Sequence, residues 1–338
     1  MFFLTDYCAA RGRSYNILSR ELMYMLNTYR GCLLGAVLGD ALGMPYETLP
    51  ARRLGRLSAP AFGRAYRGHP NHNLLPGQYT DDGQIILMAA RCLKDGTFNQ
   101  EEYAKELLRT YSLNKFRYPD GVLFAACKRM ESSNNLIESG VNSESAGCMS
   151  LAVPFALAFK DRREMAKALI PVCCITHTHN ASHAATLGFA LMLNTLIETH
   201  DVNAAFAALD SAAQNMDAEL FTRLQTAYRF EASGMSVDEA AAVIGTSSSV
   251  YQTLPMAAFL CKRFYVPEEL LAAAVTVGGN AGTITMLCGA FAGARFGIES
   301  LPSELLRGLE RVSVFDELAM KFYEAGLPKE EEEPAEEE

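Results

Sequence analysis

The sequence predicts an all-α, single-domain fold, and three observations lead to this prediction. Hydrophobic residues make up 49% of the 338 residues, which is enough for a substantial core. Apolar residues recur at helical spacing through stretches rich in Ala, Leu, Met and Glu. Runs of alternating β-branched residues, the pattern of exposed strands, are scarce. The loops are short, and no interior linker or fixed-period repeat divides the chain.

The first expected helix contains small residues at regular spacing. Gly31, Gly35 and Gly39 recur every four residues, which predicts a helix packed closely against a neighbour, and Asp40 and Gly43 are expected to end or bend it. Later segments with recurring apolar faces are 101–111, 162–169, 181–198, 202–213 and 267–275.

Charge and composition set the boundaries of the predicted domain. Residues 1–28 are expected to form an N-terminal extension, partly helical from Ile17, and residues 29–327 the domain. Residues 328–338 are expected to form a disordered acidic tail, because Lys329–Glu338 carries seven glutamates and one lysine. This tail accounts for −6 of the formal net charge of −9.

Several classes of protein are excluded by what the sequence lacks. No apolar run approaches the ~18 residues of a transmembrane helix, and the first 13 residues do not resemble a signal peptide. No basic stripe with interleaved aromatic residues indicates nucleic-acid binding. Nine cysteines without a C-x-x-C pair are typical of buried, reduced thiols, so we expect a cytoplasmic protein.

Thr80-Asp81-Asp82 precedes an apolar helical segment and supports two interpretations. Thr80 suits the N-cap position and the aspartates suit the first turn, where carboxylates interact favourably with the helix dipole. Alternatively, the three oxygen-bearing side chains form part of the octahedral set that Mg²⁺ prefers.

A Ser/Gly-rich segment lies in the middle of the chain. In residues 142–154, Ser145, Gly147 and Cys148 stand before an expected helix, where exposed backbone N–H groups could bind a diphosphate. Glu47 follows a Gly-Met-Pro turn. A solvated loop glutamate is its default interpretation, although its carboxylate could also close over a ligand.

A histidine cluster follows at residues 176–183. His177, His179 and His183 include an H-x-H pair and an i,i+4 pair, but no carboxylate or cysteine completes a transition-metal site. We therefore favour structural or capping roles for these histidines.

Near the C-terminus, residues 278–284 read G-G-N-A-G-T-I before an Ala/Gly-rich helical segment. A turn followed by a closely packed helix explains the glycines. The loop could offer a cation the Thr283 hydroxyl, the Asn280 amide oxygen and backbone carbonyls.

Taken in order, these blocks resemble the ADP-ribosylglycohydrolase family from about Arg30 to Glu310. The blocks are the glycine-spaced segment 31–43, Gly77–Asp82, Thr176-His177, Leu254–Ala258, the loop 278–284 and Gly289–Ala294. The family's usual C-terminal loop reads G-G-D-T-D-T-I. Several spaced blocks in order are more specific than any single block.

The resemblance implies an all-α domain whose cleft holds two Mg²⁺ ions. These ions orient the ribose of ADP-ribose while water displaces the linked group. The implied metal ligands are Thr80, Asp81, Asp82 and Thr283. Asp81 or Asp82 is expected to position or deprotonate the water, and Glu47 matches a loop glutamate near the substrate. Ser145, Gly147, Cys148 and Gly279 are expected to bind ADP-ribose. The cleft should therefore lie between the start of the 80–93 segment and the 278–283 loop, with Glu47 at its rim.

Four departures from the family pattern affect this site. Asn280 and Gly282 replace two metal-binding aspartates, Gly83 replaces a threonine, and residues 145–150 lack the usual asparagine and arginine. We therefore expect at most one Mg²⁺, bound weakly or not at all. Asn280→Asp with Gly282→Asp should strengthen binding, unless a positive φ at Gly282 resists a side chain.

Three interpretations of function follow. The first is a divergent hydrolase of an N- or O-glycosidic bond in an ADP-ribosylated or related nucleotide-sugar substrate, either a small molecule of the ADP-ribose type or a modified protein. The second is a catalytically inactive relative that binds ADP-ribose, a nucleotide or a protein partner. The third is a hydrolase of some other N-glycosidic bond.

Overall fold

The computed structural model describes residues 15–50, 55, 57–94, 96–133 and 135–327. Within these residues the protein is mostly helical and has almost no sheet, so the all-α prediction is confirmed. The one small sheet pairs β1 (Leu93–Lys94) with β2 (Thr97–Phe98) in antiparallel fashion. The tail 328–338 and the first 14 residues lie outside the described residues.

The α-helices, in chain order, are α2 (Tyr15–Gly43), α3 (Asp81–Cys92), α4 (Gln100–Ser112), α5 (Gly121–Ser133), α6 (Ala152–Ala158), α7 (Arg162–Cys174), α8 (Asn180–Thr199), α9 (Val202–Met216), α10 (Ala218–Ala232), α11 (Val237–Ile244), α12 (Val250–Arg263), α13 (Pro267–Thr276), α14 (Ala281–Phe296), α15 (Ser303–Gly308) and α16 (Val312–Ala325). Short 3₁₀ helices are η1 (Met44–Tyr46), η3 (Met149–Leu151) and η4 (Ile298–Ser300). The predicted helices are therefore present, each extended by a few residues.

The centre of the molecule is the antiparallel contact between α2 and α14. A Cβ atom at Gly35 would overlap the carbonyl oxygen of Gly289, and one at Gly39 would overlap the carbonyl oxygen of Thr285. The glycines of α2 thus allow the two backbones to touch, as the sequence predicted. Asp40, however, does not end the helix, since α2 continues through Gly43 and Asp40 lies buried inside it.

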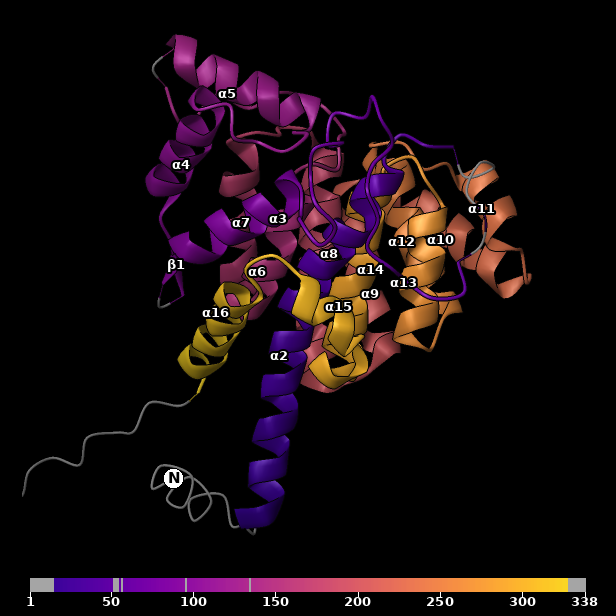
Figure 1. Ribbon diagram of the computed structural model, residues 1–338. Coiled ribbons are helices and arrows are strands. Elements are labelled where there is room, and N and C mark those ends of the chain that lie inside the picture. Colours follow the sequence, from indigo (N-terminus) through magenta and orange to yellow (C-terminus); the bar gives the residue numbers. More distant parts are fainter. Residues whose placement is uncertain (1–14, 51–54, 56, 95, 134, 328–338) are drawn as a thin grey trace, which may run out of the picture.

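The remaining helices surround this pair. Figure 1 shows α4, α5 and α16 on one side and α10 to α13 on the other, while the N-terminal half of α2 extends beyond the body. The boundary placed between residues 28 and 29 falls within α2, whose helical course begins at Tyr15.

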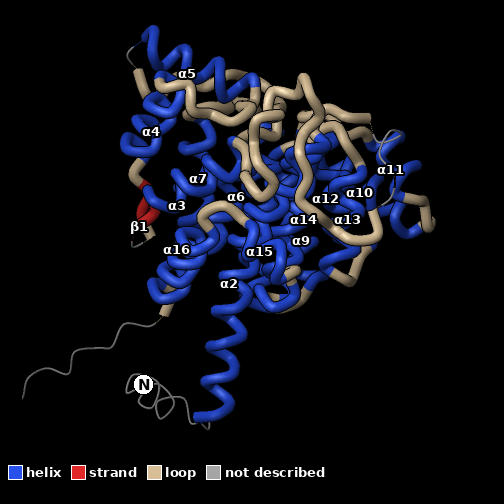
Figure 2. The backbone as a smooth tube through the Cα atoms, in the orientation of Figure 1, coloured by secondary structure: helices blue, strands red, loops and turns tan. Residues whose placement is uncertain are grey.

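The long loops gather at one end of the bundle, as Figure 2 shows. The C-terminal end of α2 and the first turns of α3 and α14 meet at this end, because α2 and α14 run antiparallel. Helix N-termini carry unpaired N–H groups and a partial positive charge, which suits anionic side chains.

Two further findings, on membrane spans and on cysteines, apply to the described residues. None of their helices combines the length and apolar character needed to cross a bilayer. The eight cysteines among them are free thiols, and all except the half-buried Cys174 are buried, as expected for reduced cysteines.

Candidate active site

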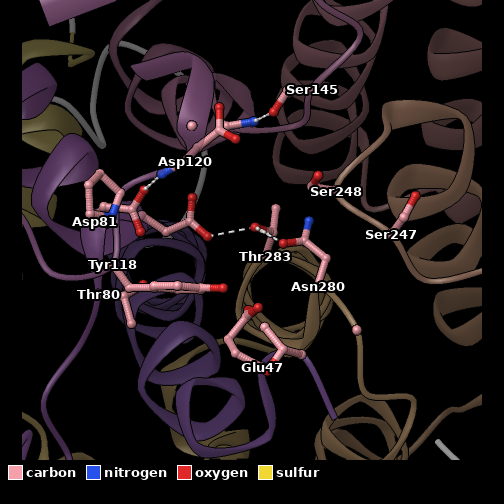
Figure 3. Close-up of a pocket in the computed structure, with 16 residues that line it drawn as sticks. Glu47, Thr80, Asp81, Tyr118, Asp120, Ser145, Ser247, Ser248, Asn280 and Thr283 are labelled. Carbon is pink, nitrogen blue, oxygen red and sulfur yellow. Dashed lines mark hydrogen bonds between the residues drawn. The ribbon is translucent and has the colours of Figure 1, made fainter. Parts of the chain in front are cut away.

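A pocket of about 370 Å³ lies among the loops at this end of the bundle. It is lined by residues from the start of α3, the α14 N-terminus and the loops around Glu47, Asp120, Ser145 and Ser248, shown in Figure 3. The sequence-predicted cleft between Thr80–Asp82 and the 278–283 loop therefore exists in the structure.

Asp40 holds the start of α3 in place. Its buried carboxylate accepts hydrogen bonds from the backbone N–H of Thr80 (2.8 Å), the N–H of Gly83 (2.8 Å) and the Thr80 hydroxyl (2.6 Å). Thr80 stands at the N-cap position as predicted, but its side chain donates to Asp40 and makes no capping bond. The helix start is thus capped by a carboxylate from α2.

The two aspartates of α3 point to different partners. Asp82 accepts hydrogen bonds from the hydroxyls of Ser150 and Thr283, the latter at 2.8 Å. Asp81 accepts from the backbone N–H of Asp120 at 3.0 Å. Asp82 therefore joins α3 to α14, and Asp81 joins α3 to the loop before α5.

Glu47 is not a solvated loop residue, because it is 8% exposed and lines the pocket. Its carboxylate accepts a hydrogen bond from the Gly282 N–H in the first turn of α14. A Cβ atom built on Gly282 would lie 2.6 Å from Oε1 of Glu47. Gly282 does not have a positive φ, so the space taken by Glu47, and not the backbone, would resist a side chain there.

Backbone hydrogen bonds fasten the loops around the pocket, which we call the rim (residues 47–50, 144–146, 245–249 and 278–280). Thr48 N–H donates to the Gly279 carbonyl at 2.8 Å, and Asn280 N–H donates to the Thr246 carbonyl at 2.7 Å. Ala146 N–H donates to the Ser248 carbonyl at 2.8 Å. Thr48 adopts a φ of 64°, a left-handed conformation unusual for threonine.

Asp120 and His177 form a buried pair beside the pocket. His177 Nε2 lies 3.2 Å from Oδ2 of Asp120, and its Nδ1 lies 2.9 Å from the Thr176 hydroxyl. Asp120 lines the pocket next to Asp81, whereas His177 is buried behind it. The histidine therefore fixes the orientation of the Asp120 carboxylate.

The carboxylates in and behind the pocket fall into two groups by their pKa: four have raised values and Asp120 has a lowered one. Burial, with the negative charge of Asp82 second, raises the pKa of Asp40 to about 7. Burial likewise raises the pKa of Asp82 to about 6, and the pKa values of Asp81 and Glu47 well above their usual range. Burial acts in the same direction on Asp120, but hydrogen bonding and charge from His177 hold the pKa of Asp120 below its usual range.

The donor set fits a hard cation in part. The pocket offers oxygen ligands only, and no lysine or arginine lines it. Thr80 and Thr283 donate their hydroxyl hydrogens to Asp40 and Asp82, so their lone pairs remain for a cation. Within the described residues, however, no three acidic, histidine or cysteine side chains form a complete metal-ligand cluster. Any ion would need hydroxyl, amide or water oxygens to complete its coordination.

Two other glycines lie against neighbouring side chains. A Cβ atom at Gly83 would lie 2.6 Å from the Tyr79 ring, so this tyrosine occupies the space that a larger residue at position 83 would need. A Cβ atom at Gly147 would lie 2.6 Å from Oδ2 of Asp120. These glycines thus make room for neighbouring side chains.

Some predicted residues do not face the pocket. Ser145, Gly147 and Gly279 line it, but the Cys148 thiol is buried and lies 3.2 Å from the Thr186 hydroxyl. The Cys148 side chain therefore cannot contact a ligand there, and its assignment remains a prediction for its backbone alone.

The histidines have the structural roles that we favoured. His179 accepts a capping bond from Ala181 N–H at the start of α8, and His183 Nε2 lies 2.7 Å from the His177 carbonyl.

Sequence reasoning missed Asp40, Asp120, Tyr118 and the Ser247-Ser248 pair. The sequence predicts Asp40 at the end or bend of a helix, and Asp120 is part of no recognisable motif. The Pro119-Asp120-Gly121 turn before α5 is the one local signal that could have directed attention to Asp120.

A comparison of the sequence with models of known protein families assigns the chain to one of them. The family model "ADP-ribosylglycohydrolase" matches residues 23–332. The chain belongs to the ADP-ribosylglycohydrolase family. This family consists of hydrolases that act on ADP-ribose linkages and are typically metal-dependent.

Relatives match over nearly their whole length. The chain is 28% identical to an uncharacterized protein of Archaeoglobus fulgidus, over 89% of this chain and 97% of that protein. It is 26% identical to ADP-ribosylhydrolase ARH3 of Danio rerio (89% and 91%) and 25% identical to the ADP-ribosyl-[dinitrogen reductase] glycohydrolase of Rhodospirillum rubrum (83% and 89%). A solved structure titled "ADP-ribosylglycohydrolase-related protein complex" shares the fold, with a TM-score of 0.73 and 22% identity over 90% and 100% of the two chains.

Proposed function

We propose that this protein hydrolyses the glycosidic bond between ADP-ribose and a linked group, using the pocket at the start of α3 and at most one Mg²⁺ ion. The observation that supports this proposal is the group of carboxylates around one pocket without a lining cation. Asp81, Asp82, Glu47 and Asp120 line it, and Asp40 lies directly behind. Such a group is stabilised by a bound cation or by a reacting centre that becomes positive.

We assign the proton-accepting role to Asp120. A base must be ionised and lie within reach of the attacking water. Burial raises the pKa of Asp82 to about 6 and the pKa of Asp81 well above its usual range, so both hold a proton more readily than Asp120 does. Asp120, whose pKa His177 keeps low, is ionised at neutral pH. Asp120 would therefore take the proton as the water oxygen bonds to the anomeric carbon.

Residues at the starts of α3 and α14 would hold the cation. Asp81, Asp82 and the Thr80 and Thr283 hydroxyls line the pocket together with Glu47, on which the negative charge of Asp82 acts. A bound Mg²⁺ ion would orient the ribose hydroxyls and lower the pKa of nearby carboxylates. The Ser247 and Ser248 hydroxyls and the backbone at Gly147 line the pocket and would contact the diphosphate, since no basic side chain lines the pocket.

Separate variants test the two roles. Turnover of peptides carrying ADP-ribose on serine or arginine is measured with Mg²⁺ and with EDTA. Asp120→Asn should lower kcat about 10²- to 10⁴-fold and leave calorimetric Mg²⁺ binding unchanged. Asp81→Asn should abolish the difference between turnover measured with Mg²⁺ and turnover measured with EDTA. Asp238→Asn, which removes an acidic residue from the first turn of α11, is the matched control.

Other outcomes would contradict the proposal. Binding of ADP-ribose without turnover of either peptide would identify an inactive relative. Turnover confined to glycosides that lack ADP-ribose would identify a different N-glycosidase. If kcat fell equally in the Asp120→Asn and Asp238→Asn variants, Asp120 would not be the proton acceptor.

A further inference from the structure

The inner part of the pocket is short of hydrogen-bond donors. Its carboxylates accept hydrogen bonds from neighbouring groups, and those kept ionised by a bound cation or by a low pKa have no proton to donate. Thr80 and Thr283 donate their hydroxyl hydrogens to Asp40 and Asp82, as described above. Asn280 donates through Nδ2 to the Thr253 hydroxyl at 2.9 Å. A substrate atom that gains negative charge in this pocket therefore finds few side chains able to stabilise it.

Tyr118 is the exception. It lines the pocket, and its hydroxyl has no hydrogen-bond partner among the described residues. In Figure 3 its side chain reaches across the pocket, with the hydroxyl toward the side where Glu47 and Asn280 lie. Burial, and next the nearby Glu47 carboxylate, raise the pKa of Tyr118 above its ordinary value, so this hydroxyl keeps its proton and is a donor at neutral pH.

The backbone holds Tyr118 in an uncommon conformation. Its φ of 54° is left-handed, although it is a bulky residue that precedes Pro119. Such a conformation is strained and persists only where neighbouring contacts impose it.

Contacts on both sides impose the conformation of Tyr118. Arg117 forms a bidentate ion pair with Glu310 and donates to the Tyr79 carbonyl at 2.9 Å, while its own carbonyl accepts from Asp81 N–H at 3.0 Å. On the other side, Asp120 N–H donates to the Asp81 carboxylate. The tyrosine thus lies between two fixed residues.

Other donors near the pocket are less suitable. Ser247 and Ser248 are exposed and belong to the rim, away from Asp81 in Figure 3. The Thr48 hydroxyl lies 3.4 Å from the Tyr66 hydroxyl, so these two groups pair with each other. Tyr118 alone combines a free hydroxyl with a position over the carboxylates.

We propose that the Tyr118 hydroxyl donates a hydrogen bond to the departing oxygen of an O-linked substrate, which makes it a catalytic residue specific to the leaving group. The proposal rests on the proposed function. As the C1–O bond breaks, the departing oxygen takes the Tyr118 proton. The attacking water bonds to C1 and gives its proton to a pocket carboxylate, from which the tyrosine oxygen is reprotonated. Water is the sole co-reactant.

The experiment compares two leaving groups. One substrate is a peptide with ADP-ribose on serine, whose departing alkoxide needs a proton. The other is ADP-ribose joined to 4-nitrophenol, whose phenolate departs without one. Tyr118→Phe removes only the hydroxyl and keeps the ring and the backbone constraint. Tyr66→Phe, which removes a hydroxyl outside the pocket lining, is the matched control, and melting curves verify folding.

We expect Tyr118→Phe to lower kcat on the serine substrate about 10²-fold and on the nitrophenyl substrate less than about 5-fold. The control should change neither by more than about 2-fold, within the usual effect of a surface change. Equal losses on both substrates, or no loss on either, would overturn the inference and leave the proposed function intact. Absence of turnover by the wild-type protein on both substrates would overturn both.

Discussion

The first turns of α3 and α14 face the same pocket but obtain their carboxylates in different ways. The first turn of α3 contains Asp81 and Asp82, whereas that of α14 contains no acidic residue. Yet both turns are paired with a carboxylate from another segment. Asp40 of α2 accepts from the start of α3, and Glu47, just after η1, accepts from Gly282 of α14.

The comparison shows how a helix start without an acidic residue of its own can still face an anion. Glu47 comes from 235 residues away in the sequence, and its oxygen lies next to the volume that a side chain at position 282 would enter. A carboxylate supplied by another loop satisfies the helix N-terminus as well as a local one does. Variants that break the Asp40 pairing with α3 or the Glu47 pairing with α14 should show whether the two carboxylates contribute equally to stability and to cation binding.

The largest effect should come from disturbing α2, which carries Asp40 and leads through η1 to Glu47. Gly39→Ala places a methyl group against the Thr285 carbonyl, so α2 must move away from α14. We expect the free energy of unfolding to fall by about 3 kcal/mol, at the upper end for overpacking. Urea denaturation measures this fall. Gly55→Ala, where no atom lies within 4 Å of the new methyl, is the control. A loss below about 1 kcal/mol in Gly39→Ala would contradict the tight contact.

A double-mutant cycle sharpens the comparison at α14. Gly282→Asp alone should be destabilising by about 1–3 kcal/mol, because the new side chain meets the Glu47 carboxylate. In the Glu47→Ala background the same change should be tolerated, which gives a coupling energy of about 1 kcal/mol or more.

Denaturation of the four proteins in the cycle gives the coupling, and calorimetry gives the Mg²⁺ affinity of each. If the double variant binds Mg²⁺ at least as tightly as the wild type, position 282 and Glu47 are interchangeable carboxylate positions. Additive effects on stability would show that the two positions are independent.

The smallest effect concerns pH and the pairing at α3. Burial raises the pKa of Asp40 to about 7 and that of Asp82 to about 6, above the unfolded value of about 4. The native state then binds more protons than the unfolded state, so its stability should fall as pH rises from about 5 to 7. Carboxylates with lowered pKa values, such as Asp120, lose their contribution below this window.

A native state that binds one proton more than the unfolded state loses about 1.4 kcal/mol per pH unit, so we expect a decrease of that order between pH 6 and 7, measured as urea-unfolding free energy without divalent ions. Mg²⁺ should reduce the decrease if it binds these carboxylates. Asp40→Asn should make the dependence on pH shallower, whatever its effect on overall stability. An Asp40 variant with an unchanged slope would show that another group titrates.

The sequence predicted the fold because helical spacing is a local property. The glycines of α2 predicted a close helix contact, and this agreement follows from a short-range pattern that needs no knowledge of the rest of the chain. That Thr80, Asp81, Asp82 and Thr283 meet at one cleft was implied by the family resemblance and not by local spacing.

The rest depended on long-range contacts. Asp40 caps α3 through hydrogen bonds from Thr80 and Gly83, which lie 40 and 43 residues later in the chain. Glu47 pairs with the start of α14 through Gly282, which lies 235 residues later. Asp120 gains its low pKa from His177, which lies 57 residues later. Nothing in the spacing of these residues indicates that they meet, so sequence reasoning assigned Glu47 to a solvated loop by default.

The fastened rim has a consequence for how ligands exchange. Its four loops are joined by main-chain hydrogen bonds, so the opening behaves as a fixed aperture and not as a lid. Molecules are then selected by whether they fit the width of the opening, and departure of products depends on their own contacts with the walls. Hydrogen exchange should accordingly be slow at the bonded rim amides of Thr48, Ala146 and Asn280, with or without ligand.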